Sequence, residues 1–260
     1  MLKFPSELRY DIVSKDWVVI ATGRAKRPET FKQRRRKIEV PKSSCPFCQL
    51  STQGRATLIF VKGKRNPFNN GIPKGWTTAS FPNKYPAFIP SPKLQRRKEG
   101  ALYQILNAVG FHEIVVTRSH TKQIGQFSLP RVKELIDVFQ ERYLALMKEK
   151  FVCNISIFQN HGVEAGASLA HPHSQIITTP LIDPDLRKAL ATSARFFRRY
   201  KKCIYCVMDE WELKSKKRIV FENDDFLVLC PFASKGAFEI IISPKKHLPY
   251  FEQITEKEKL

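Results

Sequence analysis

Two histidines and a glutamine occupy alternate positions near the middle of the chain, at His171, His173 and Gln175. Alternate side chains of an extended segment point to the same face, so we expect all three on one side of a strand over 174–178. A neutral imidazole can attack phosphorus, bind a metal or carry a proton near pH 7, and an amide can hold a phosphate oxygen. Pro172 lacks a backbone donor, which favours an edge or rim position. The pattern therefore predicts phosphate or metal chemistry rather than three structural strand residues.

A glycine-rich segment leads into this polar face. A buried strand is predicted over 151–158, followed by a loop that contains Asn160, Gly166 and Ser168. Glycine lets the backbone approach a phosphate so closely that its N–H groups can donate to it. We therefore expect this loop to hold phosphate beside His173.

Cys45 and Cys48 form a Cys-x-x-Cys pair. In a reducing compartment such a pair binds zinc or acts as a redox dithiol more often than it forms a disulfide. A redox site would require a strand-to-helix junction that is not evident here, and zinc would require two further ligands. His120, which follows a strong β run, and His171 are the candidates, so the sequence predicts a zinc site.

Together these motifs resemble the active-site signature of the galactose-1-phosphate uridylyltransferase branch of the histidine-triad superfamily. Members of that branch carry His-x-His-x-Gln after an Asn-x-Gly-x-x-x-Gly-x-Ser segment, as this chain does. The resemblance implies that His173 attacks the α-phosphorus of a nucleotide sugar and that Gln175 positions the phosphate. It also implies that Asn160 and Ser168, with Gly166 between them, contact the nucleotide phosphates.

Other segments resemble the same family. A hairpin predicted over 8–21 precedes Arg-Ala-Lys-Arg-Pro, where Arg24 and Arg27 are candidate phosphate ligands because guanidinium groups clamp phosphates bidentately. In the proline-rich stretch 81–88 the resemblance places Asn83 near the base or ribose. Zinc-bearing family members use two cysteines and two histidines, which matches the four candidate ligands above.

The elements that position these groups follow from hydrophobic periodicity. Apolar residues recur at three- and four-residue spacing over 129–150, which predicts an amphipathic helix. Residues 62–76 are rich in glycine, proline and asparagine and are expected to form a loop. We expect an α+β fold, a histidine-triad-like antiparallel sheet covered by that helix.

A second copy of this unit is predicted after residue 184. Cys203 and Cys206 resemble the first cysteine pair, a strand pair is expected over 220–231, and the segment ending in His247 resembles the one ending in His120. We therefore expect domains over 1–184 and 185–260, the second incomplete at its C-terminus. Cys203, Cys206 and His247 would be three ligands of a second metal site. In the family, the second domain also supplies residues around the sugar and at a dimer interface, so the resemblance implies a homodimer. Because the second copy is expected to be incomplete here, the activity of this chain has to be tested.

The chain is strongly basic, with 45 Lys and Arg against 24 Asp and Glu and a net charge of +21. Such a field attracts phosphorylated partners of any size. Basic runs occur at 32–37, 96–98 and 195–202, but none of the nucleic-acid-binding signatures accompanies them, so nucleic acid is not an expected partner. No apolar run approaches the length of a membrane span and no signal-peptide pattern is present, which predicts a cytoplasmic protein.

These observations predict uridylyl transfer from UDP-glucose to galactose 1-phosphate, by a ping-pong mechanism through a uridylyl-histidine intermediate. Ser174 occupies a position that is glycine in the familiar bacterial enzymes and, like the second cysteine pair, resembles plant-type ADP-glucose phosphorylases. Adenylyl transfer from ADP-glucose to phosphate is therefore the first alternative. A zinc-stabilised nucleotide- or RNA-binding protein without chemistry is the second, and it predicts strongly salt-dependent binding to nucleic acid.

Overall fold

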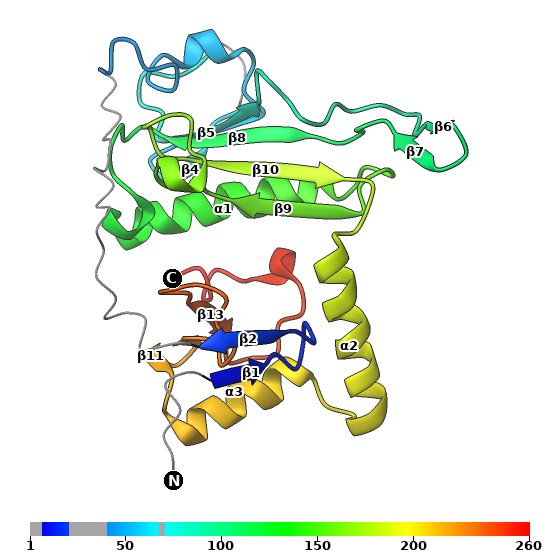
Figure 1. Cartoon of the computed structure of the whole chain (residues 1–260). Helices are drawn as coiled ribbons and strands as arrows, with labels where there is room; N and C mark the ends of the chain where they lie inside the picture. The colour runs from blue at the N-terminus through cyan, green and yellow to red at the C-terminus, as the bar shows by residue number, and fades with distance from the viewer. Residues whose placement is uncertain (1–6, 21–40, 68–70) are drawn as a thin grey trace, which may run out of the picture. The chain divides into compact units, whose positions relative to one another are not determined.

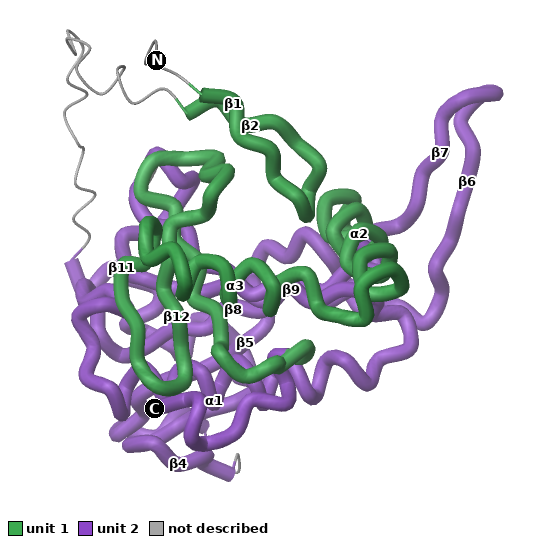
Figure 2. Tube along the Cα trace, turned by 90° about the horizontal axis from the view of Figure 1, so that it is seen from below, with its two compact units in different colours: residues 1–34, 183–250 green, residues 35–182, 251–260 purple. Residues whose placement is uncertain are grey.

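The computed structural model describes residues 7–20, 41–67 and 71–260. Arg24 and Arg27 lie outside these residues. The chain divides into two compact units, one of residues 1–34 with 183–250 and one of residues 35–182 with 251–260 (Figure 2). The N-terminal segment thus groups with residues after 183, and the expected division into two histidine-triad-like domains stays a prediction.

The larger unit is built on a six-stranded antiparallel sheet with the order β4-β3-β5-β8-β10-β9 (Figure 1). Its strands are β3 (Leu58–Val61), β4 (Lys64–Arg65), β5 (Thr78–Pro82), β8 (His112–Thr117), β9 (Asn154–Phe158) and β10 (His173–Thr179). A separate hairpin of β6 (Arg96–Glu99) and β7 (Tyr103–Leu106) extends beyond the sheet, and the first of these strands carries one of the basic runs. The antiparallel sheet and the mixed α+β composition confirm the expected fold class.

Helix α1 (Leu129–Leu146) covers one face of this sheet. Its buried residues Leu135 and Val138 pack with Val115 of β8 and Ile176 of β10. Val138 and Ile176 are completely buried, and burying such a side chain contributes about 1.5–3 kcal/mol. The helix confirms the amphipathic pattern, although it ends four residues before the predicted limit, where the chain tightens into turns.

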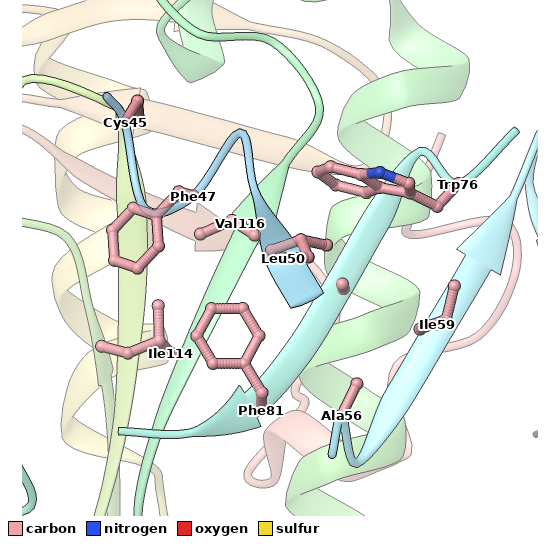
Figure 3. Packing of buried hydrophobic residues seen from close by; sticks show 10 residues of the cluster. Cys45, Phe47, Leu50, Ala56, Ile59, Trp76, Phe81, Ile114 and Val116 are labelled. Carbon is pink, nitrogen blue, oxygen red and sulfur yellow. The ribbon is translucent and has the colours of Figure 1, made fainter. Parts of the chain in front are cut away.

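The opposite face of the sheet is covered by the segment that contains the first cysteine pair, and Figure 3 shows this packing. Phe47 and Leu50 gather with Phe81 of β5 and with Ile114 and Val116 of β8. All of these side chains are buried. The apolar residues around Cys45 and Cys48 therefore bring the thiols onto the face of the sheet that also carries His173.

Two expectations about the strands need correction, and the expected position of Pro172 is confirmed. The strand before the glycine-rich loop begins at Asn154 rather than at 151 and lies half-exposed at the sheet edge, so it is not buried. Pro172 precedes the first paired residue of β10, at the rim of the sheet as expected, so it interrupts no ladder bond although the strand itself is internal. The expected loop at 62–76 contains β4, which pairs with the end of β3.

Glycine is required at one point where the backbone passes close to another strand. A Cβ atom on Gly110 would lie 2.1 Å from the carbonyl oxygen of Thr178. Without that side chain, the following Phe111 can donate its N–H to the hydroxyl of Thr178 at 2.8 Å. The start of β8 is thereby held against β10, the strand that carries the candidate nucleophile.

The smaller unit contains the predicted N-terminal hairpin, β1 (Glu7–Tyr10) paired with β2 (Trp17–Ile20). It also contains β11 (Ile219–Glu222), β12 (Phe226–Leu229) and β13 (Ile241–Pro244), which form a three-stranded antiparallel sheet. The strand pair expected over 220–231 is confirmed. Helices α2 (Pro184–Tyr200) and α3 (Ile204–Ser215) were not predicted.

Among the described residues, no helix is long and apolar enough to cross a membrane.

Candidate active site and metal groups

Strand pairing places the candidate catalytic residues on one face of the large sheet. His173 pairs with Val116 of β8, and Gln175 pairs with Ile114. Both are half-buried, whereas their neighbours Ser174 and Ile176 are buried toward α1. The period-two pattern of the sequence therefore correctly predicts that His173 and Gln175 share one face of the strand.

A backbone hydrogen bond determines which nitrogen of His173 carries the proton. Its Nδ1 atom lies 2.9 Å from the carbonyl oxygen of His171. A carbonyl oxygen can only accept, so Nδ1 carries the hydrogen and the lone pair of the neutral ring is on Nε2. No described residue forms a hydrogen bond with Nε2. The side chain is thus held in the tautomer that an imidazole nucleophile requires.

Packing restricts the orientation of the same ring. The ring of Phe47 lies 5.0 Å from that of His173 and 5.7 Å from that of His171, measured between centroids. Phe47 also contacts Phe81, at 5.9 Å. The Cys-x-x-Cys segment therefore positions the candidate nucleophile through its aromatic residue, in addition to carrying possible metal ligands.

Gln175 is held by His112, a residue that the sequence analysis did not identify. The Oε1 atom of Gln175 lies 2.8 Å from Nε2 of His112. On the other side of the His112 ring, the backbone N–H of Ala87 donates to Nδ1 at 3.1 Å. His112 begins the strand that corresponds to the β run predicted before His120. Its alternate positions place His112 on the same face as Gln175 once the pairing of β8 with β10 is known.

The glycine-rich loop joins β9 to β10. Asn160 is half-buried, and Gly166 and Ser168 are exposed. Gly166 has φ +78°, in the left-handed region that glycine adopts without strain, and a short 3-10 turn, η4 (Val163–Ala165), precedes it. The structure thus places the three residues in the loop that leads to His173, and their contacts with substrate stay a prediction.

Asn83 lies directly after β5 and is engaged within the protein. Its Oδ1 atom accepts a hydrogen bond from the N–H of Tyr85 at 2.9 Å, which stabilises the turn. Its Nδ2 atom lies 3.0 Å from Nε2 and 3.5 Å from Nδ1 of His112. A role for Asn83 at the base or ribose stays a prediction.

The four predicted ligands of the first metal site come together. The ligand atoms of Cys45, Cys48, His120 and His171 all lie within 4.8 Å of one another. Cys48 Sγ is 3.2 Å from Nδ1 of His120 and 3.7 Å from Nδ1 of His171. Nε2 of His171 donates to the carbonyl oxygen of Thr117 at 2.9 Å, so its Nδ1 directs a lone pair at the sulfurs. This tautomer is the one that a metal ligand needs.

Protonation in this group depends on burial. Burial lowers the pKa of His171, so the ring is neutral, although the bond to Thr117 opposes this effect. Burial and the adjacent Cys45 thiol raise the pKa of Cys48 to about 11. The Cys48 thiol is therefore protonated near neutral pH unless a cation displaces its proton, which links metal binding to proton release.

A second group with the same chemistry lies in the smaller unit. Cys203, Cys206 and His247 also have ligand atoms within 4.8 Å of one another, with 3.3 Å between Cys206 Sγ and His247 Nδ1. Cys203 caps the N-terminus of α3 and Cys206 lies in its first turn. Both predicted sets of ligands are therefore assembled, four residues in one unit and three in the other.

A hollow of about 650 Å³ lies beside the first metal group. Cys48, Trp76 and Arg118 contribute to its lining, whereas His173 and Gln175 do not. The hollow therefore borders the metal group through Cys48 and is not lined by the candidate catalytic residues.

The chain is similar to proteins of known family along most of its length. Residues 3–183 match the family model described as galactose-1-phosphate uridyl transferase, N-terminal domain. The chain is 30% identical to an ADP-glucose phosphorylase of Arabidopsis thaliana over 96% of its own length and 69% of the relative's. It is 28% identical to a galactose-1-phosphate uridylyltransferase of Thermotoga maritima, over 97% of its own length and 71% of the relative's.

A solved structure agrees with these sequence matches. The crystal structure of an ADP-glucose phosphorylase from Arabidopsis thaliana with bound ADP-glucose superposes with a TM-score of 0.74 at 27% identity. The match covers 98% of this chain and 73% of that one. The likeness therefore extends over both compact units of the chain.

Proposed function

Because the chain belongs to the galactose-1-phosphate uridylyltransferase family and is a nucleotidyltransferase, we propose that it forms a covalent nucleotidyl intermediate on His173. The donor would be a nucleoside-diphosphate sugar and the acceptor a second molecule that carries phosphate. The observation that carries the proposal is the hydrogen bond from His173 Nδ1 to the carbonyl of His171, which leaves the lone pair on Nε2.

The reaction would proceed in two displacements at the α-phosphorus. In the first, His173 Nε2 forms a P–N bond while the bond to the bridging oxygen breaks, which releases the sugar 1-phosphate. In the second, a phosphate oxygen of the acceptor attacks the same phosphorus and the P–N bond breaks, which restores the imidazole. A covalent intermediate divides one difficult step into two easier ones.

The remaining catalysis would come from positioning and charge stabilisation, as phosphoryl transfer generally requires. The amide of Gln175 would donate to a phosphate oxygen, and N–H groups of the loop around Gly166 and Ser168 would hold the nucleotide phosphates. Asn160 would contribute to the same contacts. Arg24 and Arg27 are proposed as further phosphate ligands on sequence grounds alone.

Two nucleotides are candidates for the transferred group. Uridylyl transfer between UDP-glucose and galactose 1-phosphate is our first proposal, as in the uridylyltransferases of the family. Adenylyl transfer from ADP-glucose to phosphate is favoured by a specific observation, since both the relative at 30% identity and the superposed structure are ADP-glucose phosphorylases. A homodimer, which the family resemblance implies, stays a prediction for this chain.

We also propose that the Cys45, Cys48, His120 and His171 group binds structural zinc. Tetrahedral zinc places sulfur and nitrogen ligands about 3.5–3.8 Å apart. Two of the sulfur–nitrogen separations in this group, 3.5 and 3.7 Å, lie within that range, and the third, between Cys48 and His120, is shorter at 3.2 Å. Four protein ligands would leave no open position, so the ion would stabilise the segment that carries Phe47 and take no part in the displacements. The three-residue group with Cys203 is proposed as a second zinc site.

Intact mass after separate incubation with UDP-glucose and ADP-glucose, without acceptor, tests the proposal. A uridylyl adduct would support the transferase assignment, and an adenylyl adduct would support the phosphorylase assignment. Either should disappear in His173→Asn. If neither donor forms an adduct, and the protein instead binds RNA with strong salt dependence, the alternative of a binding protein without chemistry would replace ours.

A further inference from the structure

His112 is placed to act on Gln175 although it lies on a different strand. It opens β8 and pairs with Ile177, so it stands diagonally across from Gln175 on the same face of the sheet. Only 9% of its surface is exposed. A buried imidazole needs partners for both nitrogens, and His112 has them in Ala87 and Gln175.

The backbone of Ala87 determines the tautomer of His112. An amide N–H can only donate, and it points at Nδ1 from 3.1 Å, so Nδ1 must carry the lone pair. The proton of the neutral ring is therefore on Nε2. The group that Nε2 contacts at 2.8 Å must then be an acceptor, which identifies it as the oxygen of the Gln175 amide.

The orientation of the Gln175 amide follows from this tautomer. With Oε1 engaged by His112, the NH₂ group occupies the other arm of the amide. No described residue accepts a hydrogen bond from that nitrogen. If the amide turned over, its carbonyl oxygen would meet the phosphate oxygens of a substrate, and two acceptors repel each other.

We propose that His112 is a positioning residue that keeps the NH₂ group of Gln175 directed at the reacting phosphate. The inference rests on the proposed function, because it assigns a partner to a residue of that site. Ala87, His112 and Gln175 then form a relay in which one backbone N–H determines the orientation of a side chain two contacts away. Nδ2 of Asn83 lies 3.0 Å from the same Nε2, but an amide nitrogen cannot accept the proton that Nε2 carries.

The kinetic test measures the rate of nucleotidyl-protein formation in single turnover, with whichever of UDP-glucose and ADP-glucose labels the wild-type protein. His112→Phe keeps a planar ring but removes both ring nitrogens. We expect the rate at saturating donor to fall about tenfold, as for the loss of one organising hydrogen bond, with little change in donor affinity. His112→Gln, which can still donate an amide N–H, should recover part of the rate.

A double-mutant cycle separates positioning from general destabilisation. In a Gln175→Ala background, His112→Phe should change the rate by less than about threefold, because the amide that it orients is gone. The same tenfold loss in both backgrounds would overturn the proposal. Wild-type rates in the single variant would also overturn it while leaving the proposed function intact, whereas an absence of any adduct on the wild-type protein would overturn both.

Thr178→Val is the matched structural control. Thr178 is completely buried on β10 and accepts the N–H of Phe111, the neighbour of His112. Its replacement should lower thermal stability without changing the rate of adduct formation. If Thr178→Val slows the reaction as much as His112→Phe, the effect is one of local packing and the proposal fails.

The tautomers of His112 and His173 can be measured directly on the wild-type protein, so this test does not depend on the folding of a variant. Nitrogen-15 NMR of the imidazole rings distinguishes the two neutral tautomers, and we expect His112 to carry its proton on Nε2 and His173 on Nδ1. A His112 ring protonated on Nδ1 would reverse the Gln175 amide and overturn the proposal. Removal of His112 should also shift the side-chain NH₂ resonances of Gln175.

Discussion

Nδ1 of His173 lies 2.9 Å from the carbonyl oxygen of His171, the residue two positions before it in the chain. Through its own ring, His171 joins the first metal group, with Nδ1 3.5 Å from Cys45 Sγ. One residue therefore links the two functions of this region. Its side chain is a candidate metal ligand, and its backbone determines the tautomer of the candidate nucleophile.

His173→Asn should abolish the covalent adduct while leaving the fold intact. An asparagine amide can still donate to the His171 carbonyl, but it lacks a nitrogen lone pair that can attack phosphorus. Intact mass after incubation with the donor is the primary measurement, with the melting temperature as the control for folding. A variant that turns over at the wild-type rate would reject His173 as the nucleophile.

His171→Ala should remove about one bound metal ion per chain, because the first group would lose one of four ligands. We expect the melting temperature to fall by about 5 °C or more, which corresponds to roughly 2 kcal/mol for a chain of this size. Elemental analysis of purified protein measures the metal. His161→Ala is the control, since His161 is exposed and belongs to neither metal group, and unchanged zinc in His171→Ala would reject His171 as a ligand.

The reactivity of Cys48 should depend steeply on pH once the metal has been removed by a chelator. The pKa of the Cys48 thiol is raised above its ordinary value, to about 11. The reactive thiolate is therefore scarce at low pH, and its fraction increases as the pH rises toward 11. At pH 8 roughly one molecule in a thousand carries it. Alkylation followed by peptide mapping should show slow modification of Cys48 while the exposed Cys153 reports reagent access. Rapid modification of Cys48 at pH 7 would contradict this expectation.

Arg142→Ala should destabilise the protein strongly. Arg142 forms two hydrogen bonds to Glu113, at 2.8 and 2.6 Å, and Glu113 is buried next to His112 in the sequence. Its removal would leave a buried carboxylate without its cation, which costs about 3–5 kcal/mol. The exposed pair of Arg65 and Glu141 is the control, and Arg65→Ala should cost less than about 1 kcal/mol. Chemical denaturation measures the free energy of unfolding of both variants. Equal losses would refute the conclusion that the buried pair of Arg142 and Glu113 stabilises the protein more than the exposed pair.

Gly110→Ala should destabilise the junction of β8 and β10. The new Cβ would meet the backbone oxygen of Thr178, which cannot move without shifting the strand, and such overpacking costs about 1–3 kcal/mol. Gly125→Ala is the control, because a Cβ there meets nothing within 4 Å. Equal melting temperatures for the two variants would show that β10 can shift without cost.

Much of the site was predictable because its signals are local in the sequence. Alternation over two residues placed His173 and Gln175 on one face, and the spacing of Cys45 and Cys48 indicated a metal. The apolar periodicity of α1 followed from contacts three and four residues apart, which a single segment contains. The family resemblance rested on the same short motifs, and the match over residues 3–183 confirmed it.

Only the tertiary structure could identify the partners of these residues. His112 lies 63 positions before Gln175, and nothing in its own segment indicates that β8 and β10 are neighbours. The same holds for the edge position of β9, since strand order depends on pairing between segments that are distant in the sequence. Sequence periodicity determines the face on which a side chain lies, whereas contacts between distant segments determine its hydrogen-bond partner, its tautomer and the direction of its lone pair.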